Sequence, residues 1–534
     1  MSKRLRVLVI ELVAPGQTSG VQARVLFPNF ATVMAQAVAV YCQQAGHDVD
    51  YQCYTGRRPL LDCLTNRPDL VFVCAFTHAA LAAYAVSNFC RKQGAVTVLG
   101  GPHARAFPAH ALRHFDYVLG LTDRELVQDL IARASPQRPV GLYLTAARQP
   151  TRLPSVAERW ELIASTHAGA PVKSVALLGS LGCPYSCSFC VDAEVAYQPL
   201  DFDELKADLR FIASKMEEPL VVFHDPNFGV RFDETLGALE EAVPPGSVDF
   251  AAESSLSLLS EARLRVLARN GFRAILPGIE SWFELGAKSK TGRLQGVEKV
   301  KQVAEHVNLV QRHVPYVQAN FVVGLDSDMG DEPFELTQRF IDAAPGAFAA
   351  IALLTSYGQS APLSAELRRE RRLLPMPFHF LNSGYATNVI PKHYSWDALY
   401  GRMGALLRHN FSWKAILRRH QAVRGALPRW INLVRGISGE GRGRARYLEH
   451  TRRRLAQDPA LLTFLQGHSQ QVPEFFAREV RRQLGSLGPH LPPEALSYDP
   501  YEVLDVSAPH AVGTAPPKRS DIVSLRRSLT DAAG

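Results

Sequence analysis

Short apolar stretches alternate with helical segments twice along this chain, and this alternation restricts the fold more than any other feature. In the first part, strands are predicted at residues 6–11, 49–54, 70–75, 95–99 and 117–119, with helices at 30–44, 79–92 and from Arg124. Short apolar strands separated by helices are typical of a parallel, doubly wound α/β sheet. Ligands of such sheets lie outside the carboxyl ends of the strands.

The second alternation follows a Pro- and Ala-rich stretch, residues 136–172, which reads as a linker with a short helix around Trp160. Strands are predicted at residues 175–178, 220–223, 248–252, 273–277, 317–323 and 348–354. Six strand–helix units in a row predict a partial (β/α)6 barrel whose chemistry lies on the loops after the strands.

Three cysteines, Cys183, Cys187 and Cys190, stand in a C-x3-C-x2-C spacing directly after the first barrel strand. A short loop with this spacing can present three thiolates to one cubane cluster and leave the fourth iron without a protein ligand. A structural zinc site would need a fourth Cys or His at close spacing, and no cysteine follows Cys190. Zinc and simple buried thiols remain the alternatives.

The motif, with an aromatic residue before its last cysteine, resembles that of the radical S-adenosylmethionine (SAM) enzymes. The resemblance implies that Cys183, Cys187 and Cys190 hold a 4Fe–4S cluster whose open iron binds SAM. It also implies that Phe189 packs near the adenine of SAM. The alternative role of Phe189 is to anchor the loop over the barrel core.

The first α/β segment resembles the cobalamin-binding domain that precedes many radical SAM domains. The likeness includes the turn Gly100-Gly101-Pro102-His103, and it implies that this turn and Thr77 border the cofactor. The segment lacks an Asp-x-His-x-x-Gly motif, so no histidine is evident as a cobalt ligand. The alternative is a Rossmann-like domain without a cofactor, in which the glycines only form a tight turn.

Loops of the barrel also match this subfamily. Asp225 and Asn227 resemble residues that follow the second strand, and Gly278-Ile279-Glu280-Ser281 resembles the Gly-Ile-Glu-Ser after the fourth. By resemblance, Asp225 and Asn227 lie near the methionine part of SAM. Glu253, Glu280 and Ser281, with Gly278 in the same motif, lie near its ribose side. The alternative for each carboxylate is a loop cap or a surface salt bridge.

Composition limits the remaining choices. Eight cysteines without a disulfide-like framework suit a reducing cytoplasm, and no apolar stretch approaches the length of a membrane span. The chain has a net charge of +8, and from residue 396 onward it carries 21 Lys and Arg against 12 Asp and Glu. This excess suits an anionic substrate, a membrane surface or, as the preferred interpretation, a solvated helix face.

The predicted organisation is a cobalamin-binding domain (1–135), a linker (136–172), a radical SAM barrel (173–395), a basic helical extension (396–506) and a disordered tail (507–534). The family resemblance implies methyl transfer to an unactivated carbon of a small molecule, with an external electron donor such as flavodoxin or ferredoxin and no nucleic acid. A cobalamin-dependent cyclase, oxidase or rearrangement enzyme is the first alternative. A regulatory or binding protein that carries a cluster is the second.

Overall fold

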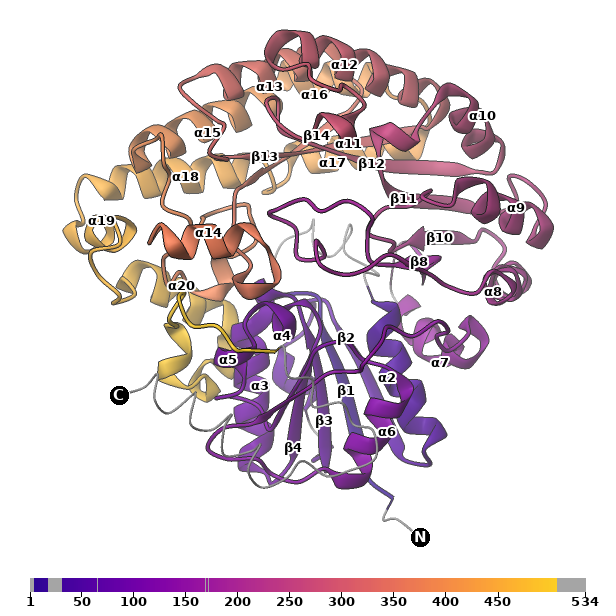
Figure 1. Ribbon diagram of the computed structural model, residues 1–534, viewed down its shortest axis with the longest axis vertical. Coiled ribbons are helices and arrows are strands. Elements are labelled where there is room, and N and C mark those ends of the chain that lie inside the picture. The colour runs from indigo at the N-terminus through magenta and orange to yellow at the C-terminus, as the bar shows by residue number, and fades with distance from the viewer. Residues whose placement is uncertain (1–3, 18–30, 65, 169, 171, 507–534) are drawn as a thin grey trace.

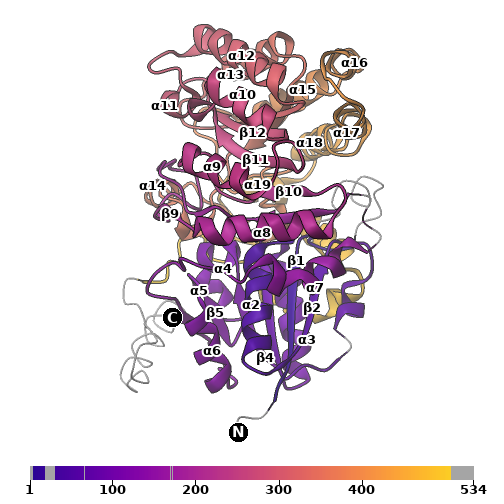
Figure 2. The ribbon, with the colours of Figure 1, turned by 90° about the vertical axis from the view of Figure 1, so that its right-hand side faces the viewer.

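The computed structural model describes residues 4–17, 31–64, 66–168, 170 and 172–506. Two α/β units are stacked along the long axis of the molecule, and C-terminal helices pack beside them (Figures 1 and 2). The predicted tail, 507–534, and the predicted start of the first helix at Phe30 lie outside the described residues.

The first unit contains a six-stranded parallel sheet with the order β2-β1-β3-β4-β5-β6. Its central strand β3 is almost fully buried because helices cover both faces of the sheet. The strands are β1 (Arg6–Leu12), β2 (Asp48–Tyr54), β3 (Leu70–Ala75), β4 (Val96–Gly100), β5 (Tyr117–Leu119) and β6 (Leu142–Leu144). The helices are α2 (Val33–Gln44), α3 (Ala80–Lys92), α4 (Pro102–Ala106), α5 (Pro108–Ala111), α6 (Arg124–Arg133) and α7 (Val156–His167).

Strand β6 and helix α7 lie within the stretch that was predicted as a linker, and α7 is the short helix that was predicted around Trp160. β6 pairs with β5 along its whole length, so the first sheet extends beyond the last predicted strand. Helix α7 begins with a capping box, in which Ser155 and Glu158 satisfy each other's backbone N–H groups. It packs against α2 of the first unit and α8 of the second, and therefore bridges the two.

The second unit contains six parallel strands in the order β14-β13-β12-β11-β10-β7. These strands are β7 (Ser174–Leu177), β10 (Leu220–Phe223), β11 (Asp249–Ser255), β12 (Phe272–Glu280), β13 (Tyr316–Val323) and β14 (Phe348–Leu353). The helices between them are α8 (Phe202–Lys215), α9 (Phe232–Ala242), α10 (Glu261–Arg269), α11 (Gly286–Ser289), α12 (Gly296–His313) and α13 (Glu332–Ala343), and α14 (Leu363–Arg369) follows β14.

The two faces of this second sheet differ in burial. In β13, Ala319 and Phe321 are buried in the core formed with the covering helices, whereas Asn320 and Val322 are only half-buried. β14 shows the same alternation, with small half-buried alanines on the inner face. The helix-facing side is therefore a packed core, and the inner side leaves open space inside the partial barrel.

The C-terminal region is helical, as predicted. It comprises α15 (Trp396–Asn410), α16 (Trp413–Ala422), α17 (Ala426–Ile437), α18 (Arg442–Leu455), α19 (Pro459–Leu465) and α20 (Glu474–Leu484). After α20 the chain returns to the first unit, where Asn88 donates a hydrogen bond to the His490 carbonyl oxygen (2.7 Å). Among the described residues, no helix combines the length and the apolar character needed to cross a bilayer.

Candidate functional site

The two ends of the cysteine loop lie close together. They are joined by a short antiparallel pair of strands, β8 (Ser180–Leu181) before the loop and β9 (Gln198–Pro199) after it. Gly182, directly before Cys183, has a φ of +66°, and a Cβ there would overlap the carbonyl oxygens of Val195 and Ala196. Only glycine fits this approach, so the start of the loop is fixed where the first cysteine follows.

The three cysteines lie in this one loop, and all three are free thiols. Cys187 is 8% exposed, and its backbone carbonyl accepts a hydrogen bond from Cys190 N (3.0 Å). Burial raises the pKa of the Cys190 thiol to about 11, and Asp192 N donates to its sulfur (3.4 Å). In the described part of the chain, no three His, Cys, Asp or Glu side chains converge as ligands of one metal ion.

Asp225, after β10, holds the segment that leads into this loop. Its two carboxylate oxygens accept hydrogen bonds from Gly179 N (2.9 Å) and Ser180 Oγ (2.7 Å). The side chain is buried, and burial raises its pKa to about 6 against the opposing effect of these bonds. Asp225 therefore positions the cysteine loop, and these contacts occupy both of its oxygens.

Asn227 differs, because half of its amide has no partner. The residue is 4% exposed, and its Oδ1 accepts a hydrogen bond from Ser255 Oγ (3.1 Å). Its Nδ2 is buried without a hydrogen-bond partner in the structure. A buried donor of this kind is costly unless something accepts from it, so Nδ2 is a candidate contact for a ligand.

Glu280 forms an ion pair that sequence reasoning missed. Its carboxylate accepts a hydrogen bond from Lys288 Nζ of α11 (2.6 Å), and Glu280 itself has a φ of +66°. A Cβ at Gly278 would collide with both side chains of the pair, which explains the glycine in this motif. Burial lowers the pKa of Lys288, but the charges of Glu280, Cys187 and Cys190 raise it overall.

The remaining acidic residue is Glu253 in β11. Its side chain is exposed to solvent, yet burial raises its pKa, with Lys288 opposing and Glu280 adding to the shift. Because the charges of Lys288 and Glu280 both act on this carboxylate, Glu253 lies near their ion pair. Glu280 also borders a cavity of about 270 Å³ that Asn320 and Ala350 of the barrel interior line.

Two further predicted residues have structural contacts. Ser281 is buried, and its hydroxyl accepts hydrogen bonds from Phe283 N (3.1 Å) and Glu284 N (3.3 Å), as in a loop cap. Phe189 packs against a small apolar cluster that includes Leu325 and Leu354, and this contact fits the loop-anchor alternative.

The Gly-Gly turn of the first unit lies at the carboxyl end of β4. A Cβ added at Gly100 would have no heavy atom within 4 Å, so the space beside this glycine is open. Gly101 has a φ of +90°, and its Cβ would lie 3.1 Å from both Ala75 O and Cys74 Sγ. Pro102 begins α4, and Thr77 is buried at the end of the neighbouring strand β3.

His103 lies in the core and not on the surface of the turn. It is fully buried, and its Nε2 lies 2.6 Å from the Tyr84 hydroxyl. His110 Nδ1 approaches the same hydroxyl (3.1 Å), and His114 stacks on the Tyr84 ring with centroids 4.4 Å apart. We call His103, His110 and His114 around Tyr84 the histidine cluster.

The two candidate cofactor regions face each other across one ion pair. Arg105 in α4, four residues after Gly101, contacts Asp192, two residues after Cys190 (Nη2–Oδ1, 2.7 Å). Both side chains are about one quarter exposed. The carboxyl end of the first sheet and the cysteine loop are therefore neighbours, as the stacked arrangement in Figure 1 also shows.

Comparison with known proteins agrees with this arrangement. No protein-family model matches the chain. TsrM from Kitasatospora setae, a radical SAM methyltransferase solved with cobalamin and a [4Fe-4S] cluster, matches 85% of this chain and all of its own, with a TM-score of 0.54 and 14% identity. OxsB, a cobalamin-dependent SAM radical enzyme solved with aqua-cobalamin, matches 92% of this chain and 80% of its own, with a TM-score of 0.56 and 12% identity.

The chain has the fold of the cobalamin-dependent radical SAM enzymes. The predicted fold class, a Rossmann-like sheet followed by a partial barrel and a helical extension, is thus confirmed. The fold that the resemblance to radical SAM enzymes implied is therefore the fold observed.

Two curated relatives are similar in sequence. The bacteriochlorophyllide d C-12(1)-methyltransferase of Chlorobaculum tepidum is 25% identical over 380 residues, which cover 68% of this chain and 79% of the relative. The bacteriochlorophyllide d C-8(2)-methyltransferase of the same organism is 26% identical over 289 residues, which cover 51% of this chain and 62% of the relative.

The residues present fit the cofactors of this radical SAM fold. Three thiols in one loop, with a backbone N–H donated to Cys190 Sγ, are a suitable donor set for a cluster with one open iron. The unpaired Asn227 Nδ2 and the exposed Glu253 carboxylate are polar groups that can contact SAM. The open space at Gly100 offers room at the strand ends for cobalamin.

Proposed function

We propose that this chain is a cobalamin-dependent radical SAM methyltransferase that acts on an unactivated carbon of a small molecule. The observation that carries the proposal is the Arg105–Asp192 ion pair, because it holds the Gly100-Gly101 turn beside the cysteine loop. When bound, the cluster and SAM supply a 5′-deoxyadenosyl radical, and cobalamin supplies a methyl group. The chain's task is to hold these groups in register and to exclude water.

In this proposal Cys183, Cys187 and Cys190 hold the cluster, while Gly182 and Asp225 fix the loop that carries them. Asp225 does so through Gly179 and Ser180, so it is a positioning residue. The Lys288 ammonium lies close enough to Cys187 and Cys190 to stabilise negative charge on their sulfurs.

SAM is proposed to lie at the carboxyl ends of the barrel strands. Asn227 Nδ2 is free to donate to an acceptor on SAM, and Glu253 and Glu280 are placed to accept from its hydroxyl or ammonium groups. Ser281 shapes this loop through its cap. Phe189 anchors the cysteine loop through its packing against the apolar cluster described above. Its contact with adenine remains a prediction.

Cobalamin is proposed to lie between the two units, against Thr77, Gly100, Gly101 and Pro102. The buried His103 is placed in the core, so we propose that the turn contributes its backbone and small side chains and no cobalt ligand. The domain limits predicted from the sequence, and a flavodoxin or ferredoxin as electron donor, belong to the same proposal.

The test is anaerobic turnover with reduced, reconstituted protein and methyl-labelled SAM. A tetrapyrrole related to bacteriochlorophyllide d is the first substrate to try, because the sequence relatives methylate such compounds. One 5′-deoxyadenosine and one S-adenosylhomocysteine per methylated product is the expected result. Altered but unmethylated product would support the cyclase, oxidase or rearrangement alternative, and absence of 5′-deoxyadenosine would support a regulatory or binding protein.

A further inference from the structure

An exposed apolar face runs along α16 and α17 of the C-terminal region. Five large apolar side chains on these helices are between 45% and 66% exposed: Trp413, Leu417, Leu427, Trp430 and Ile437. Large apolar side chains scattered singly on a surface are ordinary, but a group of five on two contacting helices indicates an interaction site.

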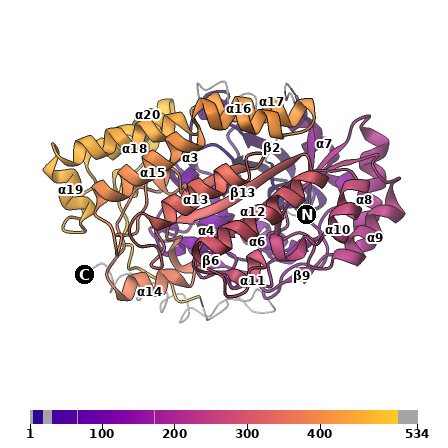
Figure 3. The same cartoon turned by 90° about the horizontal axis from the view of Figure 1, so that it is seen from above.

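The spacing of these residues places them on one side of each helix. Trp413 and Leu417 are four residues apart in α16, and Leu427 and Trp430 are three residues apart in α17. The buried residues of α17, Asn432 and Gly436, lie on its opposite side. Figures 2 and 3 both place α16 and α17 at the periphery of the molecule. The high exposure of the five apolar side chains shows that they face solvent there.

The same segment carries an unbalanced positive charge. Residues 412–437 contain six Lys and Arg and neither Asp nor Glu. Arg418 pairs with Asp342 and Arg435 with Glu440, and Arg419 is buried. Lys414, Arg424 and Arg429 are exposed and, among the residues that the structure describes, have no carboxylate within 4 Å.

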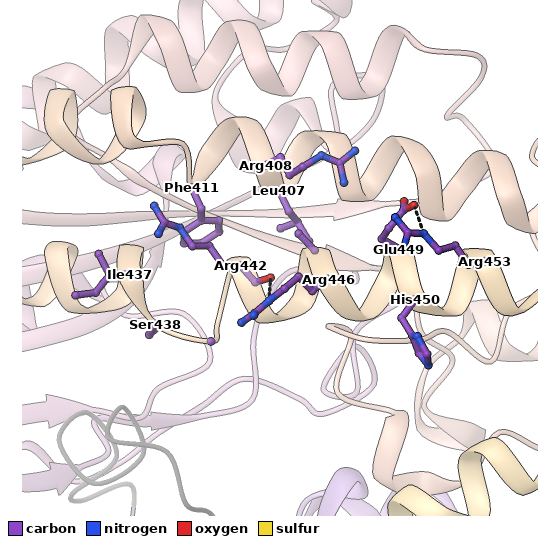
Figure 4. Close-up of a pocket in the computed structure, with 12 residues that line it drawn as sticks. Leu407, Arg408, Phe411, Ile437, Ser438, Arg442, Arg446, Glu449, His450 and Arg453 are labelled. Atoms are coloured by element: carbon purple, nitrogen blue, oxygen red, sulfur yellow. Dashed lines mark hydrogen bonds and ion pairs between the residues drawn. The ribbon is translucent and has the colours of Figure 1, made fainter.

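A groove rich in arginine continues this face. It has a volume of about 780 Å³ and lies between α15, the end of α17 and α18 (Figure 4). Its lining includes Ile437 of the apolar face and Arg442, whose guanidinium lies 4.2 Å from the centre of the Trp413 ring. Arg408 and Arg446 also line it, and within the described chain neither they nor Arg442 pair with a carboxylate.

We infer that the α16–α17 face docks onto the surface of an anionic lipid bilayer, with the groove receiving lipid phosphates. Exposed Trp and aliphatic side chains beside cations are the pattern of helices that lie in a membrane interface. Cations near an anionic leaflet add attraction, and arginine pairs well with phosphate. The inference is independent of the proposed reaction.

Two alternatives, a second copy of the chain and a solvated helix face, explain this surface less well. A second copy of the chain would bring Lys414, Arg424 and Arg429 against the same cations of its partner, and like charges oppose such a contact. The solvated helix face preferred from the sequence explains the charges but not the five exposed apolar side chains. In Figure 3, β9, which follows the cysteine loop, and α14 lie at the edge opposite α16 and α17, so docking does not cover that edge.

The test is co-sedimentation of the full chain with phosphatidylcholine vesicles that contain or lack phosphatidylglycerol. We expect binding only to the vesicles with phosphatidylglycerol, and weaker binding at high salt because the attraction is screened. The double variant Leu427→Ser/Trp430→Ser should bind at least about tenfold more weakly, since it removes the inserted apolar groups. The double variant Lys414→Glu/Arg429→Glu should bind the vesicles with phosphatidylglycerol more weakly. Its binding should also depend less on salt.

A matched control is Val503→Ser, which removes an exposed apolar side chain (49%) outside this face and should bind like the wild type. Tryptophan emission adds an independent readout, because Trp413 and Trp430 should shift to shorter wavelengths on binding, and the shift should be absent in Trp413→Phe/Trp430→Phe. Circular dichroism confirms that each variant folds.

Three results would overturn the inference. The first is a folded chain that binds neither vesicle, or a control that loses as much binding as the double variant. The second is self-association that the Leu427→Ser/Trp430→Ser change abolishes. The third is emission from Trp413 and Trp430 that is already typical of buried rings without vesicles, which means that another segment covers the face.

Discussion

Acidification should weaken the histidine cluster, and the size of the effect follows from its burial. Burial lowers the pKa of His103 to about 3 and that of His114 to about 4, and the pKa of His110 lies well below its usual value. An unfolded histidine has a pKa of about 6.5. Between pH 7.5 and 5.5, the unfolded state therefore takes up protons that the folded state does not.

The sign and the magnitude follow from proton linkage. The stability that each buried, neutral histidine contributes to the folded state is fully present above the pKa of the unfolded histidine. This contribution falls as the pH drops below that pKa. Each buried histidine should cost about 1.4 kcal/mol between pH 7.5 and 5.5, and the three together about 4 kcal/mol. Buried carboxyl groups with raised pKa values, such as Glu11 and Asp225, act in the opposite direction, so a comparison with variants is needed.

The assay is hydrogen exchange of α3, which carries Tyr84, at the two pH values, corrected for intrinsic exchange rates. His103→Gln should lose about 1.4 kcal/mol less opening free energy than the wild type over this interval. Replacing the exposed His468 by Gln should leave the fall unchanged. Equal falls in the wild type and in a variant with Gln at all three cluster positions would refute the reasoning.

Four further predictions concern the cofactor sites. Cys187→Ala should lose reconstituted iron and 5′-deoxyadenosine formation together; a 4Fe–4S paramagnetic signal that persists with all three cysteines replaced by Ala would contradict the assignment. Lys288→Met should destabilise the protein by about 3 kcal/mol in chemical unfolding, because it strands the buried Glu280 carboxylate, and Glu280→Gln in the same chain should restore part of the loss. Asn227→Ala should weaken SAM binding about tenfold in calorimetry, while Ser255→Ala, which leaves Nδ2 untouched, should bind SAM normally. Gly101→Ala should destabilise the protein by about 1–3 kcal/mol and weaken cobalamin binding. The paramagnetic spectrum of bound Co(II)-cobalamin should show no axial nitrogen splitting, since a splitting would require a histidine that the buried His103 does not offer.

Much of the fold was predictable because the signals are local. β3 and β10 have the bounds that their apolar stretches predict, and α6 begins at the predicted Arg124 behind its cap Asp123. β6 was missed because three residues in a Pro-rich stretch carry too little pattern. Its strand character comes from pairing with β5, which no local sequence signal reports.

The site divides in the same way. The cysteine spacing and the Gly-Gly turn are contiguous in sequence and were found. Lys288 was missed because its role depends on a contact with Glu280 across a loop, and a lone lysine in a four-residue helix has no distinguishing pattern. His103 was expected at the cofactor, and its burial depends on Tyr84 and on the η5 turn (Phe378–Phe380) more than 250 residues later; its ring lies 4.7 Å from that of Phe378.

Helix α7 leaves the chain without a free pivot between its two α/β units. One side of the helix is fixed on α2 and the other on α8, and its buried Arg159 donates a hydrogen bond to Gln36 Oε1 of α2 (2.6 Å). A domain that moves its cofactor between two distant sites needs a flexible linker. Here the linker contains a helix that is packed against both units. In the proposed function, the cluster site and the cobalamin site would therefore keep a constant separation, and the substrate would have to diffuse to them.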